Sequence, residues 1–189
     1  GSAAIGAQIR VYAWHQQNNK DSLSDTEDLL VSPPMTSIPA ARQQLIRVIL
    51  PVPPSGDTER AYRLVVDELP GSNNMAEKDG VRFLLRYSIP VFVNCKDQQP
   101  DLNRVTFSID RLAHPVMLKV RNNGTQHLKL SDITLHAGAQ SVSMSKGLLG
   151  YVLPQSEKEW PLPKGMTNAS SLSLNLNDNE KQQTINITP

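Results

Sequence analysis

The sequence predicts an all-β protein built from two antiparallel sandwiches in tandem. Helical periodicity is almost absent, whereas short stretches of alternating apolar and polar residues recur along the chain. Proline and glycine, with 14 and 10 copies, supply many potential turns between them. A length of 189 residues suits one large domain or two small ones, because a domain usually spans roughly 100–150 residues.

The first half of the chain contains five strand candidates. In residues 9–14, the apolar Ile9, Val11 and Ala13 occupy alternate positions, so this stretch has one apolar face. The polar stretch 16–27 that follows is expected to be a long loop. The other candidates are residues 29–31, which stop at two prolines, and residues 45–50, 62–69 and 81–93.

The second half contains six short strand candidates in fewer than 90 residues, which favours a sandwich. The polar residues 95–101 are expected to link a first domain, residues 1–94, to a second domain, residues 102–189. Asn122, Asn123 and Gly124 predict a tight turn between two strands. The strand candidates are residues 105–109, 116–120, 128–130, 142–144, 172–176 and 185–187.

Residues 81–93 alternate for longer than an ordinary strand does. Every odd-numbered position from Val81 to Val93 is apolar, over 13 residues, about twice the usual strand length of 5–6. Pro90 cannot donate to a ladder, so this part of the strand is expected at a sheet edge or a bend. Two interpretations stay open: a core strand that spans a domain junction, or a strand that pairs with another chain and fills its pockets.

Composition excludes several classes of protein. The 19 basic and 18 acidic residues give a net charge of +1, which argues against a nucleic acid partner. No run approaches the roughly 18 apolar residues of a membrane span, so no membrane insertion is expected. The single Cys excludes an internal disulfide framework and a Cys-rich zinc module.

No arrangement of residues predicts catalysis, a metal site or a cofactor. Ser143 and Lys146 have the spacing of serine acyl enzymes, but that chemistry needs a helical turn, and the residues around Ser143 alternate like a strand. The four histidines lack the spacing of metal ligands. Asp67 and Glu68 are strand neighbours that point to opposite faces, so they do not flank one substrate. The protein is therefore expected not to be an enzyme.

Several segments, taken in order, resemble the periplasmic pilus-assembly chaperones of the PapD-like family. They are residues 30–39 (LVSPPMTSIP), 45–48 (LIRV), 62–70 (YRLVVDELP) and the stretch that ends at 89–93 (IPVFV). The segments most similar to the branch that serves archaic chaperone–usher and spore-coat-U-type pili are 62–70, 86–90 (RYSIP), 147–154 (GLLGYVLP) and 160–163 (WPLP).

This resemblance implies a fold, a location and partners. It implies two immunoglobulin-like domains in a boomerang arrangement, and the first domain here lacks the two strands with which the family's first domain opens. It implies a periplasmic chaperone, without a cofactor, that binds a pilus subunit (pilin), prevents its premature polymerisation and delivers it to an outer-membrane usher. The alternative is a tandem immunoglobulin-like structural or adhesive module, in which the long strand pairs within its own chain.

The resemblance also implies a set of binding residues. In the family, the last strand of the first domain lends alternating apolar side chains to the groove that the pilin's missing strand leaves open. The matching positions are Val81, Phe83 and Leu85, with Tyr87 and Ile89 continuing the face. Periodicity alone selects the same positions.

The family's two cationic anchors for the pilin carboxylate have no counterpart, because one lies on a missing strand and the other falls at Pro90. If residues 62–69 and 81–93 form a hairpin, Arg63 is expected opposite or diagonal to Arg86, where a bound carboxylate would neutralise both. Alternatively, the two arginines lie on opposite faces or pair with Asp67, Glu59 or Glu68. The family further implies an acidic residue that helps to fix the interdomain angle, and Glu68 is the candidate interdomain contact.

Overall fold

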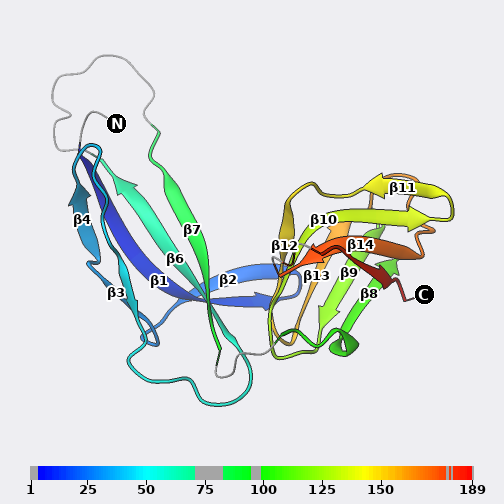
Figure 1. Ribbon diagram of the computed structural model, residues 1–189, viewed down its shortest axis with the longest axis horizontal. Coiled ribbons are helices and arrows are strands. Elements are labelled where there is room, and N and C mark those ends of the chain that lie inside the picture. The colour runs from blue at the N-terminus through cyan, green and yellow to red at the C-terminus, as the bar shows by residue number, and fades with distance from the viewer. Residues whose placement is uncertain (1–3, 71–82, 95–98, 178, 180, 189) are drawn as a thin grey trace. The chain divides into compact units, whose positions relative to one another are not determined.

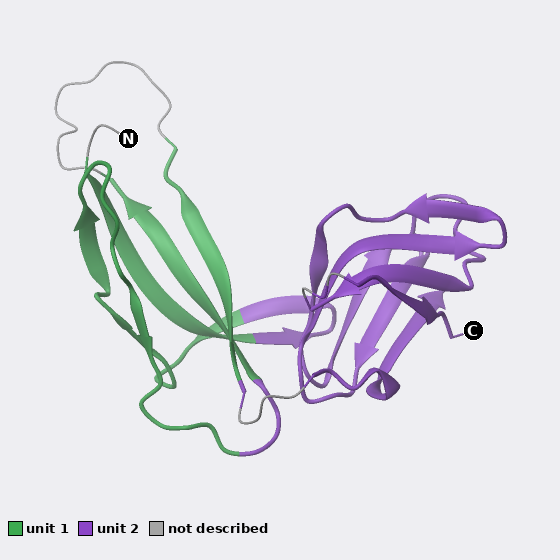
Figure 2. Ribbon diagram, viewed as in Figure 1, with its two compact units in different colours: residues 1–14, 23–55, 60–93 green, residues 15–22, 56–59, 94–189 purple. Residues whose placement is uncertain are grey.

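The computed structural model describes residues 4–70, 83–94, 99–177, 179 and 181–188. These residues form fifteen strands, and their only helical segment is the 3-10 turn Leu102–Arg104 (Figure 1). The all-β prediction is therefore confirmed. Within the described residues, no helix is long and apolar enough to cross a membrane. The chain divides into two compact units, one of residues 1–14, 23–55 and 60–93, the other of residues 15–22, 56–59 and 94–189 (Figure 2).

The main sheet of the first unit has the order β2-β1-β6-β7, and β4 pairs with the start of β1. Its strands are β1 (Ile5–Gln17), β2 (Lys20–Asp25), β4 (Met35–Ile38), β6 (Arg60–Leu69) and β7 (Arg86–Val93). A second, two-stranded sheet consists of β3 (Leu30–Ser32) and β5 (Arg47–Ile49).

One face of the main sheet carries a buried apolar cluster of the first unit. Ala7, Ile9 and Leu64 are buried there, and Val66 and Val91 pack against them. Ala7 and Ile9 are two residues apart in β1, as Leu64 and Val66 are in β6, and Ile9 lies opposite Val66. Val91 lies opposite Tyr62, two residues before Leu64, so all five side chains are on one face of the sheet.

The prediction of a long loop at residues 16–27 is wrong. β1 continues to Gln17 and turns into β2 through Asn18 and Asn19, both of which have positive φ (51° and 61°). Asparagine tolerates this left-handed conformation, which suits a two-residue hairpin turn. The hairpin escaped detection because all of β2 is exposed, so burial imposes no apolar alternation on it.

The second unit is a sandwich of two sheets. One has the order β13-β9-β8, and the other the order β11-β10-β14-β15, with β12 paired to β10. Both sheets contribute to one buried core that includes Phe107, Leu118, Leu130 and Leu172. The strands are β8 (Val105–Asp110), β9 (Met117–Asn122), β10 (Leu128–Ala137), β11 (Gln140–Ser143), β12 (Leu148–Val152), β13 (Ser156–Pro161), β14 (Ser171–Leu176) and β15 (Gln183–Asn186).

The predicted tight turn at Asn122 is not a hairpin turn, because β9 and β10 belong to different sheets. Asn122 is buried and makes structural hydrogen bonds instead. Its amide donates to the carbonyl of Gln126 (2.8 Å), and its side-chain oxygen accepts from the Gly124 N–H (2.9 Å). A buried amide with satisfied bonds stabilises this crossing between sheets.

The second unit includes two segments that the sequence places in the first domain, residues 15–22 and 56–59. Gln16 exemplifies their attachment: it donates to the carbonyl of Tyr151 (3.0 Å) and accepts from the N–H of Leu153 (2.8 Å). Of the linker expected at residues 95–101, residues 95–98 lie outside the described residues. The domain boundaries stay a prediction.

Candidate functional site

β7 is an edge strand. It pairs with β6 along one side, and no other strand of the described residues pairs with its outer side (Figure 1). An unpaired strand edge presents a row of backbone groups to which a further strand can bind. The candidate site is this edge together with the side chains that flank it.

The apolar side chains predicted to bind a partner lie on one face. Tyr87 is opposite Val66 and Ile89 is opposite Leu64, on the face that carries the core of the unit. They are nevertheless 57% and 47% exposed, and Phe83 and Leu85, just before the strand, are 80% and 53% exposed. Val81, the remaining predicted residue, lies outside the described residues.

β7 begins at Arg86, so the prediction that the strand includes residues 83–85 is wrong. Its partner β6 ends at Leu69, and Pro70, which follows, has no N–H to offer. The last bonds between the two segments are made by Glu68. Its N–H donates to the carbonyl of Leu85 (2.9 Å), and its carboxylate accepts from the Leu85 N–H (3.2 Å).

Glu68 therefore fixes the backbone of Leu85, the residue just before β7. The sequence did not predict this contact, which lies within the first unit. Its side chain is on the same face as Leu85, because the two residues continue the β6–β7 register. The expected role of Glu68 as an interdomain contact stays a prediction.

A mostly apolar groove of about 390 Å³ lies beside the start of β7. Leu85, Tyr87 and Val66 form part of its wall, and Arg42 and Glu68 add charge. It draws residues from separate parts of the chain, so no local sequence pattern reveals it. The full lining is Ile5, Ala7, Ile38, Pro39, Ala40, Ala41, Arg42, Val66, Glu68, Leu85 and Tyr87.

Arg86 belongs to a charge cluster on the opposite face of the sheet. It lies directly opposite Asp67 and binds its carboxylate, which also accepts from Arg10 (2.6 Å). The hydrogen bonds from Arg86 and then from Arg10 hold the pKa of Asp67 below its usual value. Two guanidinium groups on one carboxylate leave this cluster with one positive charge in excess.

Arg63 is placed differently from the prediction. It lies opposite Pro90, so the expectation that it would be opposite or diagonal to Arg86 is wrong. Four residues separate the two positions along the strands, about 13 Å. The Arg63 guanidinium instead sits 3.6 Å from the centre of the Trp14 ring, a cation–π arrangement. Trp14 is buried and also packs against Phe92, with ring centroids 6.1 Å apart.

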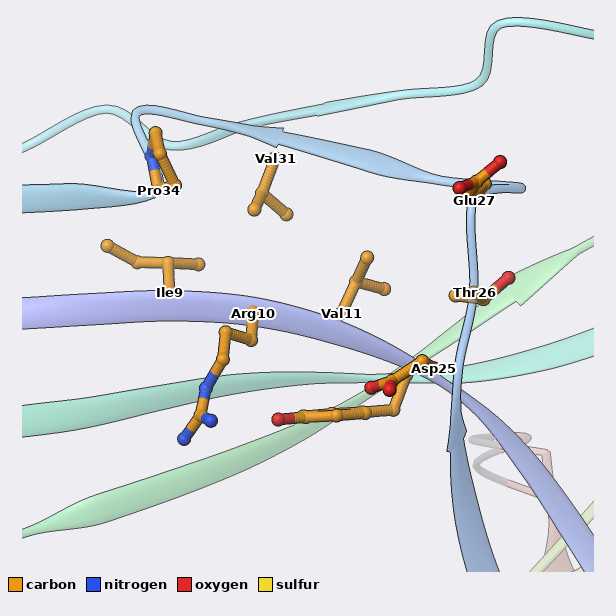
Figure 3. A pocket seen from close by; sticks show the side chains of 9 residues that line it. Ile9, Arg10, Val11, Asp25, Thr26, Glu27, Val31 and Pro34 are labelled. Carbon is orange, nitrogen blue, oxygen red and sulfur yellow. The ribbon is translucent and has the colours of Figure 1, made fainter.

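A second, more open cavity of about 610 Å³ lies along β1 (Figure 3). Ile9 and Val11 point from β1 into this space, and Val31 points into it from β3. Asp25, Thr26 and Glu27 line it as well. Its apolar wall is part of the core face of the sheet.

The described residues contain no group of three or more His, Cys, Asp or Glu side chains that could hold a metal ion. Ser143, which the sequence pairs with Lys146, lies at the end of strand β11, and its hydroxyl donates to the carbonyl of Ser145. The unpaired edge of β7 and the apolar groove beside it are suited to binding an extended protein segment, because an open strand edge can pair with a further strand.

The family model for the pili and flagellar-assembly chaperones, PapD N-terminal domain, matches residues 1–98, more than half of the chain. No curated protein matches the sequence.

Solved structures give further matches over nearly the whole chain. The complex of CsuC with the tip adhesion subunit CsuE, from archaic chaperone–usher pili of Acinetobacter baumannii, matches with a TM-score of 0.74 and 27% identity, over 100% of this chain and 87% of that chain. The Salmonella enterica SafA pilin in complex with the SafB chaperone matches with a TM-score of 0.68 and 15% identity, over 98% and 84%. The Pseudomonas aeruginosa CupB2 chaperone matches with a TM-score of 0.62 and 17% identity, over 100% and 88%.

The family match and the fold agree with the resemblance read from the sequence. The family and its fold are non-catalytic, in line with a site made of a strand edge and apolar side chains. The chain belongs to the PapD-like family of pilus-assembly chaperones.

Proposed function

We propose that this chaperone acts in the periplasm and binds a pilus subunit through β7 by donor-strand complementation. In this binding mode an extended strand adds to the sheet of a partner, and its alternate side chains fill the partner's pockets. The observation that carries the proposal is that β7 is an edge strand with apolar, half-exposed side chains at Tyr87 and Ile89. Exposed apolar edges promote aggregation, so a partner that covers this one would remove a liability.

The proposed donor residues are Val81, Phe83, Leu85, Tyr87 and Ile89. The groove beside Leu85 and Tyr87 adds apolar surface on the same face, so the subunit would meet a continuous apolar strip. Burying it would provide most of the affinity, because the free energy of apolar burial scales with area.

The identity of the partner is supported by the related structures. In two of them the chaperone is solved with its cargo, a tip adhesion subunit in one and a pilin in the other. A subunit covered by β7 would be unable to join another subunit prematurely. We propose that the complex then delivers the subunit to an outer-membrane usher, where a neighbouring subunit's strand replaces β7.

The terminal carboxylate of the subunit is proposed to bind Arg63 or Arg86. The two guanidinium groups act as separate candidates, because the β6–β7 register places them four residues apart. Arg86 belongs to the cluster with excess positive charge, and Arg63 lies beside Pro90, the position of a family anchor.

The experiment that tests the proposal is affinity capture from a periplasmic extract of the source bacterium, with the full chain as bait. We expect a pilus subunit in a one-to-one complex. Leu85→Asp should abolish its recovery, because a carboxylate at a half-exposed donor position cannot enter an apolar groove without a large desolvation penalty.

A matched control separates a lost contact from a lost fold. Leu112 is 90% exposed and lies in the second unit, so Leu112→Asp should retain the subunit. Both variants should stay folded, and Leu85→Asp should melt slightly lower than wild type, because it adds a carboxylate on the face that carries Glu68. Recovery of no subunit by a well-folded wild-type protein would favour the tandem structural or adhesive module instead.

A further inference from the structure

The outer edge of β7 has an interruption that determines where a partner strand can pair with it. Residues of an antiparallel pair alternate between those that exchange backbone hydrogen bonds with the partner and those whose N–H and C=O point away. The bond from the Glu68 N–H to the Leu85 carbonyl (2.9 Å) identifies Glu68 and Leu85 as a hydrogen-bonded pair. Because the two classes alternate along the strand, the residue number, odd or even, then gives the direction of each backbone N–H and C=O group of β7.

The odd-numbered residues of β7, including Tyr87 and Ile89, point their backbone groups toward β6. The even-numbered residues Arg86, Ser88, Pro90 and Phe92 belong to the other class and point theirs to the outer edge. Pro90 satisfies this geometry, since its missing N–H deprives β6 of no hydrogen bond. The outer edge therefore offers N–H and C=O groups at Arg86 and Ser88, only a C=O group at Pro90, and both groups again at Phe92.

We propose that Pro90 is a positioning residue that ends the backbone pairing between β7 and the bound subunit. This inference rests on the proposed function and specifies the register of the same site. A subunit strand can accept hydrogen bonds from Arg86 and Ser88. If it continued, its next carbonyl would face the proline ring and would be buried without a donor, which is unfavourable.

A stop of this kind is needed because a backbone ladder does not define its own register. A strand that slips by two residues keeps every backbone bond and the same face, but each side chain then meets the wrong pocket. Pro90 removes this ambiguity on one side, because a slip past Ser88 loses a hydrogen bond. The register fixed in this way places Leu85, Tyr87 and Ile89 against the subunit's groove.

Residue-resolved hydrogen exchange on the one-to-one complex with the pilus subunit tests the inference. In the wild-type complex the amides of Arg86 and Ser88 should exchange at least about 100-fold more slowly than in the free protein. The amides of Tyr87 and Ile89 should change little, because they already bond to β6. If the Arg86 and Ser88 amides do not slow, the subunit does not pair with this edge and the proposed function itself fails.

The variant Pro90→Val distinguishes the stop from the pairing as a whole. It restores an outward N–H without altering a bond to β6, so the fold should be retained and the new amide at position 90 should become protected in the complex. One further hydrogen bond should tighten binding about two- to tenfold. Rapid exchange of this new amide in the complex, with Arg86 and Ser88 protected, would overturn the inference while leaving the proposed function intact.

The variant Ser88→Pro moves the stop two residues toward the start of the strand. It removes an outward donor and again no bond to β6, so the melting temperature should stay near the wild-type value. Binding should weaken about two- to tenfold, and Arg86 should remain protected. Unchanged affinity would mean that the outer donors do not contribute to binding, which would also overturn the inference.

Discussion

Asp67 lies directly opposite Arg86 across the β6–β7 pair, and the two side chains form an ion pair at the start of the edge strand. The pair is of the non-hydrogen-bonded class, in which opposing side chains approach most closely. A second guanidinium, from Arg10 on β1, shares the same carboxylate. One acidic side chain thus connects three neighbouring strands and fixes the point from which β7 leaves β6.

Replacing Asp67 with Asn should lower the melting temperature slightly, by no more than about 3 °C, because exposed ion pairs contribute little. The remaining effect reflects repulsion between Arg10 and Arg86, which then lose their common partner. Calorimetry in low and high salt measures the difference in melting temperature between wild type and Asp67→Asn. This difference should be smaller in high salt, because salt screens the charges. A decrease that is large and independent of salt would contradict this.

The same ion pair makes stability depend on acid pH. The pKa of Asp67 is lowered in the folded protein by Arg86 and Arg10, so the ionised form contributes stability above the unfolded pKa of about 3.9. That contribution is lost as the pH falls through the folded pKa. We expect the melting temperatures of wild type and Asp67→Asn to differ at pH 6 and to converge progressively as the pH falls from about 4 through the folded pKa. A constant difference at all pH values would exclude this origin.

Single substitutions of the two arginines test the proposed carboxylate anchor. Truncating the residue that binds the carboxylate should weaken subunit binding by about tenfold or more, because hydrogen bonds between charged groups are the strong ones. Arg63→Ala and Arg86→Ala are compared by titration with the purified subunit, with Arg121→Ala in the second unit as control. The anchor assignment fails if both variants bind like wild type.

Trp14 should be a main determinant of the stability of the first unit. It is buried, packs against Phe92 and lies under the Arg63 guanidinium, so Trp14→Ala removes several contacts at once. We expect a loss of about 3–5 kcal/mol in the free energy of unfolding. Urea denaturation followed by circular dichroism measures it. A loss below about 1 kcal/mol would mean that the site collapses around the missing ring.

The two units should unfold with different stabilities. Among the described residues, the second unit contains sixteen buried apolar side chains and the first contains eight. We expect Ile9→Ala to shift an early unfolding transition and Leu130→Ala a later one, each by about 2–5 kcal/mol. If both variants shift one common transition equally, the units unfold together.

The sequence was most informative about features that depend on one strand alone, such as which of its side chains share a face. The shared face of Tyr87 and Ile89 follows from alternation alone, because side chains at i and i+2 always lie on the same face of a strand. Alternation does not predict which residues of the neighbouring strand lie opposite them. Arg63 was expected near Arg86, but it is paired with Pro90. The alternation within each strand does not determine which residues of two strands lie opposite each other.

Other parts of the site could not be predicted for related reasons. The groove beside Leu85 is assembled from β1, the segment after β4, β6 and the start of β7, so its existence depends on tertiary packing. The β1–β2 hairpin was missed because solvent-exposed strands carry no apolar period to detect. Trp14 and Arg63 are far apart in the sequence, and only the pairing of β1 with β6 brings them together.

The attachment of β7 to β6 has a thermodynamic consequence for complex formation. The strand is paired from Arg86 to Val93 and is tied at its start by Asp67 and Glu68, so its backbone entropy is already lost before a partner arrives. Under the proposed function, the ordering penalty of association would therefore fall on the subunit, whose own core would form around the donated side chains. Calorimetric titration should then give a negative heat-capacity change larger than the area of β7 alone explains, the signature of a partner that folds as it binds.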